Sequence, residues 1–232
     1  MSTNQLTFQI AHRFIFSASA SLVICKVYPQ LTFKTSDNIL LDSIAGLNWV
    51  KEQYEKDHQP SVVNMSLGGS ADQALDDAVR SLTTAGVHVA VAAGNSNEDA
   101  GGGSPAREPS AVTVAASTIN DERASFSSFG KVVDIFAPGL NVTSAWIGLT
   151  DTVRLLSSYL RTSFHLTYIF CSSYQDTKTI SGTSMATPHI TGLIAYLLKA
   201  EPPRTPDAMS QRLQELALKN VLTGVREYFW QT

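Results

Sequence analysis

The chain has 232 residues, with 17 Lys and Arg against 20 Asp and Glu, which gives a formal net charge of −3. This length suits one or two domains and is enough to bury a sizeable core. Hydrophobic residues make up 44% of the chain and charged residues only 16%, a composition that excludes an intrinsically disordered segment. The charge balance also argues against nucleic acid as a partner, because nucleic-acid-binding domains carry a basic footprint. Two cysteines, Cys25 and Cys171, are too few for a disulfide framework, and we expect two separate buried thiols.

Two apolar stretches bear on membranes and secretion. The stretch 155–174 is interrupted by charged and hydroxyl side chains, so we expect no membrane span and no membrane partner. The stretch 14–20 faintly resembles a signal peptide with a small-residue end. The residues that follow it have the pattern of a strand, so we expect a terminal segment rather than a leader.

Strands and helices alternate along the first half of the chain. Strands are predicted at 23–28, 62–67 and 87–92, and helices at 39–54 and 74–82. Gly86 stands where it can end the second helix in a left-handed conformation. The order strand, helix, strand, helix, strand implies right-handed crossovers and a parallel sheet that is covered on both faces. The sequence therefore predicts an α/β fold.

The second half continues this pattern with longer loops. We expect short strands at 111–115 and 132–136, a helix at 184–198, and a last helix that begins at Thr205-Pro206-Asp207 and ends before Asn220. No internal repeat and no interdomain linker is apparent. Ligands of such sheets bind beyond the carboxyl ends of the strands, where Ser66-Leu67-Gly68-Gly69 and Ala92-Ala93-Gly94-Asn95 are expected.

The segment Ser181-Gly182-Thr183-Ser184-Met185-Ala186-Thr187-Pro188-His189 carries the most specific signal. Small residues before Ser184 allow a sharp turn into a helix, which places a hydroxyl at the positive end of the helix dipole. The segment is similar to the nucleophile segment of subtilisin-like serine proteases, nearest to the proteinase K branch. That resemblance implies a three-layer α/β/α fold, a monomer, and peptide-bond hydrolysis through an acyl-enzyme on Ser184. The alternative is that Ser184 or Thr183 is only a helix cap.

Asn95 and the glycine-rich strand ends resemble further parts of the same family. Asn95 matches the oxyanion-hole asparagine, which would act with the Ser184 N–H; a plain turn residue is the alternative. The segment Ser66-Leu67-Gly68-Gly69 matches the edge that pairs with a polypeptide substrate. Ala92, Ala93 and Gly94 would line the pocket together with Ser104-Pro105-Ala106. An ordinary strand-to-helix turn is the alternative for the edge.

The resemblance also implies a structural calcium ion, although the chemistry requires no cofactor. The ligands would be the carbonyl groups of Pro109 and Ala111 and the carboxylate of Asp134. A single carboxylate implies weak affinity, and Asp134 as a loop cap is the alternative.

The rest of the family's catalytic apparatus has no counterpart here. The family places D-[ST]-G and H-G-T-H-V motifs upstream of the serine, and neither occurs in this sequence. His189 follows Ser184 in the same helix, and the resemblance makes it structural. We therefore expect a domain at 23–224 that corresponds to the C-terminal two-thirds of a catalytic domain, incomplete at the N-terminus and inactive as written.

Three segments depart from the family pattern. Residues 1–22 and 225–232 match nothing in it. Between Gly148 and Ser181 lie 32 residues where the family has a short loop, and the excess falls at 153–173. We interpret this excess as translated non-coding sequence, such as a retained intron, and the tail as the same kind of error.

Two other functions are compatible with parts of the pattern. A non-catalytic peptide-binding remnant would keep the edge at Ser66 and have no turnover. An α/β-hydrolase esterase would need G-x-S-x-G, and it would need an acid and a histidine after the serine. Here the corresponding segment, Gly182-Thr183-Ser184-Met185-Ala186, ends in alanine.

The resemblance implies secretion with an inhibitory propeptide, which is not seen here. Asn141-Val142-Thr143 would be a glycosylation site in a secreted protein.

Overall fold

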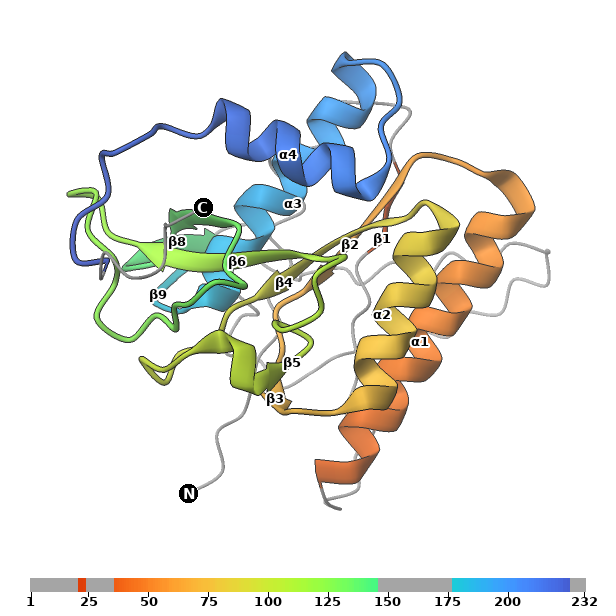
Figure 1. Ribbon diagram of the computed structural model, residues 1–232, viewed down its shortest axis with the longest axis horizontal. Helices are drawn as coiled ribbons and strands as arrows, with labels where there is room; N and C mark the ends of the chain where they lie inside the picture. Colours follow the sequence, from red (N-terminus) through yellow and green to blue (C-terminus); the bar gives the residue numbers. More distant parts are fainter. Residues whose placement is uncertain (1–20, 24–35, 146–176, 226–232) are drawn as a thin grey trace.

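The computed structural model describes residues 21–23, 36–145 and 177–225 (Figure 1). The elements in chain order are β1 (Ser21–Val23), α1 (Ser36–Asp57), β2 (Ser61–Met65), β3 (Gly69–Ser70), α2 (Gln73–Ala85), β4 (His88–Ala92), the 3₁₀ turn η1 (Ala100–Gly102), β5 (Gly103–Ser104), β6 (Val112–Ser117), β7 (Ile135–Pro138), β8 (Val142–Ala145), β9 (Thr177–Ile180), α3 (Thr183–Ala200) and α4 (Pro206–Leu216). The anomalous stretch 153–173, both cysteines, and His12 and His165 lie outside the described residues.

Five parallel strands form the main sheet, in the order β1-β2-β4-β6-β7. The parallel α/β architecture predicted from the alternating elements is confirmed. Two strand positions differ from prediction. β1 begins at Ser21, where it pairs with Ser61, and β7 runs from Ile135 to Pro138 instead of starting at 132.

Helices cover both faces of this sheet, which gives three layers (Figure 1). Neighbouring strand residues point to opposite faces: Val63 packs into a cluster with α1 and α2, and Val62 into a cluster with α3 and α4. The first cluster contains Leu47 and Val79, and the second contains Ile194. Because both faces are buried, β2 and β4 are buried along their whole length.

The helix ends follow the signals in the sequence. Asp72 caps α2 by accepting a hydrogen bond from the Leu75 N–H at 2.9 Å. Gly86 ends α2 with φ of 109°, as its position predicted. Thr205 caps α4, whose first residue is Pro206.

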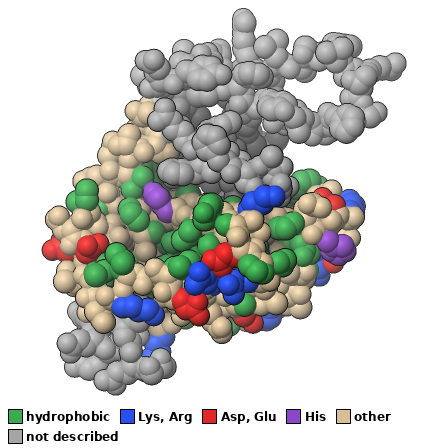
Figure 2. Space-filling model, turned by 90° about the horizontal axis from the view of Figure 1, so that it is seen from above, with side chains coloured by type: hydrophobic (Ala, Val, Ile, Leu, Met, Phe, Trp, Pro, Cys, Tyr) green, Lys and Arg blue, Asp and Glu red, His purple; other side chains and the backbone are tan. Residues whose placement is uncertain are grey.

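The surface carries charges of both signs. On the face shown in Figure 2, acidic and basic side chains lie beside one another, and no patch of one sign covers that face. None of the helices in the described part of the chain combines the length and the apolar character that a membrane span needs.

His88 is a buried polar residue at the end of the sheet opposite the strands' carboxyl ends. The residue is 4% exposed, and neither ring nitrogen has a hydrogen bond within the described residues. Desolvation lowers the pKa of His88, and weaker attraction from the backbone of Ser61, Arg204 and Thr205 offsets only part of this effect. The imidazole is therefore held in its neutral form in the folded chain.

This burial predicts an acid sensitivity. Below about pH 6.5 the unfolded chain binds a proton at His88 that the folded chain does not, so the free energy of unfolding falls as the pH falls. We expect His88→Leu to remove this contribution, which has a maximum slope of about 1.4 kcal/mol per pH unit. Urea unfolding of both proteins from pH 4.5 to 8 measures it. If the free energies of unfolding of the two proteins changed equally with pH, His88 would not be the source of the acid sensitivity.

Candidate active site

The first turn of α3 is packed against the connection that follows β7. The Gly182 N–H donates to the Gly139 carbonyl at 2.8 Å. A Cβ at Gly139 would lie 2.5 Å from Ala116 Cβ, a contact that side chains do not make, so this close approach requires glycine. Ser184 is the second residue of α3 and is half-buried. The sharp turn into a helix that the small residues predicted is therefore present.

Asn95 lies directly against this turn, although 88 positions separate it from Thr183 in the sequence. The Thr183 N–H donates to Asn95 Oδ1 at 2.8 Å, and the Thr183 hydroxyl donates to the same oxygen at 3.0 Å. The Gly94 N–H contacts Thr183 Oγ1 at 3.3 Å. Because the carbonyl oxygen of the carboxamide is engaged, its Nδ2 group remains as a donor on the exposed side of Asn95. The structure thus places Asn95 against Thr183, the residue directly before Ser184, which is the other residue that the sequence predicted for an oxyanion site.

The Ser184 hydroxyl faces the end of β2. Ser184 Oγ donates to the Ser66 carbonyl at 3.4 Å, a long contact, and Ser66 Oγ donates to the Ser184 carbonyl at 3.0 Å. Beyond Ser66, Leu67 is half-buried and Gly68 is exposed. β3 then pairs antiparallel with β5, with Gly69 opposite Ser104. The predicted binding edge therefore starts at the serine and runs along a short two-stranded ribbon.

Small residues surround the position expected for a side-chain pocket. Ala92 and Ala93 are 5% exposed, Gly94 is half-buried, and Ser104, Pro105 and Ala106 are buried.

The loop that carries Ser104 to Ala106 is held by α2. Arg107 Nε contacts Asp76 Oδ2 at 2.6 Å, and Arg80 pairs with the buried carboxylate of Glu108 at 2.5 Å. Ser104 Oγ accepts a hydrogen bond from the Asp72 N–H at 2.8 Å. Since Asp76 and Glu108 are both buried, removing either arginine would leave an unpaired carboxylate in the interior. The loop at the expected pocket is therefore held against α2 by charged pairs.

Asp134 is the carboxylate expected at a calcium site. Its Oδ2 accepts the Thr113 N–H at 2.7 Å, which places it beside the chain two residues after Ala111. Its Oδ1 accepts only long hydrogen bonds, from Ser210 Oγ at 3.4 Å and Gln214 Nε2 at 3.3 Å. Burial raises the pKa of Asp134 to about 6, and these three hydrogen bonds offset only part of that shift. Among the described residues, no Lys or Arg forms an ion pair with this carboxylate.

No histidine within the described ranges is hydrogen-bonded to Ser184. His189 Nδ1 contacts the Met185 carbonyl at 2.8 Å, one turn earlier in the same helix, and His189 is exposed. His58 follows α1 on the surface, and His88 lies at the far end of the sheet. Among the described residues, the acceptor that the Ser184 hydroxyl contacts is therefore a backbone carbonyl, that of Ser66.

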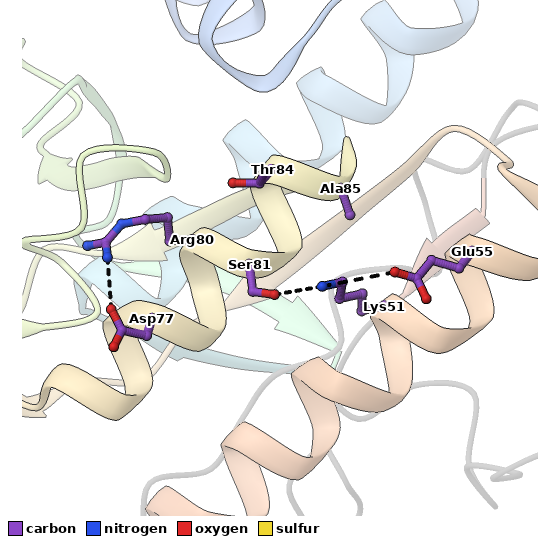
Figure 3. A pocket seen from close by; sticks show the side chains of 7 residues that line it. All are labelled: Lys51, Glu55, Asp77, Arg80, Ser81, Thr84 and Ala85. Carbon is purple, nitrogen blue, oxygen red and sulfur yellow. Dashed lines mark hydrogen bonds and ion pairs between the residues drawn. The ribbon is translucent and has the colours of Figure 1, made fainter.

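A pocket of about 400 Å³ lies between α1 and α2, away from Ser184 (Figure 3). Its charged side chains are paired: Lys51 lies 4.0 Å from Glu55 and 2.8 Å from Ser81 Oγ, and Arg80 lies 2.8 Å from Asp77. Because these charges are already compensated, the pocket offers no unpaired group that would select a ligand.

The sequence pointed to Thr183 only as an alternative helix cap, whereas the structure places it in contact with Asn95. Its hydroxyl and its N–H both donate to the Asn95 carboxamide oxygen, so Thr183 fixes the orientation of the Asn95 side chain. The sequence held a signal for this contact, because the threonine directly before Ser184 stands at the helix start, where backbone N–H groups need acceptors.

The fold and the site together define a class of protein. It is a three-layer α/β/α protein with a serine at a helix start, beside a carboxamide that follows a neighbouring strand. The chain belongs to the subtilase family, whose model matches residues 17–229. It is 43% identical over 209 residues to alkaline protease 1 of Aspergillus flavus, and 44% identical over 184 residues to a cuticle-degrading protease of Metarhizium anisopliae. It is also 45% identical over 185 residues to an extracellular serine proteinase of Thermus sp. strain Rt41A.

The matches cover most of this chain but a smaller share of the relatives. They cover 89%, 78% and 80% of this chain, and 45%, 41% and 38% of the Aspergillus, Metarhizium and Thermus proteins. A solved cold-adapted subtilisin-like serine proteinase superposes with a TM-score of 0.64 at 39% identity, over 83% of this chain and 58% of that one. The chain thus spans less than half the length of these curated relatives.

Two substitutions at Asn95 separate its structural contact from its donor group. Asn95→Ala leaves the Thr183 N–H and hydroxyl without their acceptor, so we expect the free energy of unfolding to fall by about 1 kcal/mol. Asn95→Asp keeps an acceptor oxygen and puts a negative charge at the start of α3, so stability should be retained. Urea denaturation of the three proteins measures this difference. Equal losses in both variants would contradict the arrangement.

Proposed function

We propose that this chain carries the nucleophile side of a subtilisin-like serine endopeptidase. Ser184 is the nucleophile, and Asn95 Nδ2 and the Ser184 N–H are the donors to the oxyanion. The observation that supports this most strongly is the pair of hydrogen bonds from Thr183 that hold Asn95 at the start of α3.

The chemistry follows from this geometry. Ser184 Oγ would form a bond to the carbonyl carbon of the peptide, and its proton would pass to a base. Negative charge would develop on the former carbonyl oxygen, where fixed amide donors and the positive end of α3 stabilise it without reorganising. Breaking the C–N bond would release the protonated amine and leave the acyl group on Ser184, from which water would remove it.

The base is the component that the described residues do not provide. The Ser184 hydroxyl contacts only a backbone carbonyl there, and a carbonyl cannot hold the proton at neutral pH. In subtilisin itself, loss of the triad histidine lowers kcat by about 10⁶. We therefore propose that this chain by itself has negligible peptidase activity.

A fluorophosphonate probe tests both parts of this proposal. We expect purified chain to label slowly, several orders of magnitude below an active subtilase assayed in parallel, because the hydroxyl is not activated. The residual label should map to Ser184 and disappear in Ser184→Ala. Rapid labelling of Ser184 would contradict the missing base, whereas labelling at another residue would contradict the nucleophile.

The substrate we propose is an extended polypeptide. Its backbone would pair with the edge at Ser66 to Gly69, and the small apolar walls at Ala92 and Ala93 would favour an apolar or aromatic side chain. A module that binds such peptides without cleaving them is the second candidate, and peptide affinity without turnover would favour it.

The Thermus relative is named as extracellular, which supports secretion of the protein to which this chain belongs. In that case the exposed Asn141 would be a glycosylation acceptor.

Calcium at Asp134 is a further part of the proposal. A hard cation would be held by the Asp134 carboxylate and the carbonyl groups of Pro109 and Ala111. The residues fit such an ion, because the half-buried carboxylate has no cationic partner in the described structure, and the two long contacts to Oδ1 could be displaced. The ion would supply the missing opposite charge and join the 109–111 loop to β7.

We expect calcium to stabilise the chain through this carboxylate. A calcium concentration ten times the Kd should raise the free energy of unfolding by about 1.4 kcal/mol, measured as a higher Tm than in EDTA. Asp134→Asn should lose the response, and magnesium should produce less of it because of its stricter octahedral geometry. A calcium shift of the same size in Asp134→Asn would place the ion elsewhere.

A further inference from the structure

Asn64 is a polar residue in the middle of β2, a strand in which every residue is buried. It is 5% exposed, and both ends of its carboxamide are paired. Asn64 Oδ1 accepts a hydrogen bond from Thr191 Oγ1 at 2.9 Å, and Asn64 Nδ2 donates to Ser66 Oγ at 2.9 Å. A carboxamide at this position therefore connects β2 to both α3 and the binding edge.

The connection continues to the backbone of Ser184. Ser66 Oγ, which accepts from Asn64, donates its single proton to the Ser184 carbonyl at 3.0 Å. In a regular helix that carbonyl would accept the N–H of the residue four positions later. The residue at that position is Pro188, which has no N–H. The proline thus frees the carbonyl of the proposed nucleophile, and the Ser66 hydroxyl takes the place of the missing donor.

We propose that Asn64 is a positioning residue, which sets the placement of the proposed nucleophile relative to the substrate-binding edge through Ser66. This inference depends on the proposed function for its catalytic meaning. Asn64 contacts α3 at Thr191, two turns after Ser184, and reaches Ser184 itself through Ser66, so the helix is held at two points. Without the carboxamide, the Ser66 hydroxyl is free to rotate away from the Ser184 carbonyl.

The experiment uses three variants whose side chains are all buried in the wild type. Asn64→Leu removes both links at similar volume, and Ser66→Ala removes only the link to Ser184. Thr187→Val is the matched control, because the Thr187 hydroxyl lies on the same helix but bonds within it, to the Thr183 carbonyl at 2.8 Å. Amide hydrogen exchange of 66–69 and 183–186 is the first measurement. The affinity for a labelled Ala-Ala-Ala-Phe amide peptide is the second.

We expect exchange in both segments to become about tenfold faster in Asn64→Leu and Ser66→Ala, because a lost hydrogen bond opens this region locally, and to stay within about twofold in Thr187→Val. Peptide affinity should fall about tenfold in the first two variants only. Equal acceleration in all three variants, or none in the first two, would overturn the positioning role. If the wild type binds no peptide, the proposed binding edge is wrong, while hydrogen exchange still decides the role of Asn64. Ser66→Ala keeps the test open should Asn64→Leu fail to fold.

Discussion

The first turn of α3 has more backbone groups to satisfy than an ordinary helix start. Four N–H groups at any helix start lack partners within the helix, and Pro188 additionally removes the donor that the Ser184 carbonyl would use. Asn95 Oδ1 accepts a hydrogen bond from the Thr183 N–H, and Ser66 Oγ donates a hydrogen bond to the Ser184 carbonyl. The same two residues come from the carboxyl ends of two neighbouring strands. The residues that satisfy the backbone groups of this turn are therefore also residues of the candidate site.

The parallel sheet makes this possible because it gathers chain segments that are distant in sequence at one edge. β2 and β4 are adjacent, so their carboxyl ends deliver Ser66 and Asn95 to the same helix start. The pocket loop reaches that edge by another route, through the ion pair of Asp76 with Arg107 on the side of α2. At the opposite end of the sheet, His88 has no comparable partners among the described residues.

The sequence was sufficient to predict the elements whose periodicity is strong. The helix expected at 74–82 and its end at Gly86 match α2, because apolar spacing and a left-handed glycine act locally. β3 and β5 were not predicted, since two-residue strands of glycine and serine have no periodic pattern. The Arg107–Asp76 pair joins residues 31 positions apart and has no signature in the sequence. Asn64 did leave a signal, a carboxamide inside an otherwise apolar strand, but its partners could be identified only once β2 and α3 were placed side by side.

Stabilising a negative charge and accepting a proton are separate physical requirements, and this chain meets them unequally. The Asn95 carboxamide is held at the start of α3 by Thr183, and the Ser184 carbonyl is held by Ser66, so these contacts within the described residues do not depend on a neighbouring base. Proton transfer needs a group whose pKa is close to the working pH, and no such group contacts the Ser184 hydroxyl in the described structure. A site of this kind can retain its shape for a peptide while its serine stays unreactive. Binding of a peptide and its cleavage are therefore expected to be separable properties of this chain.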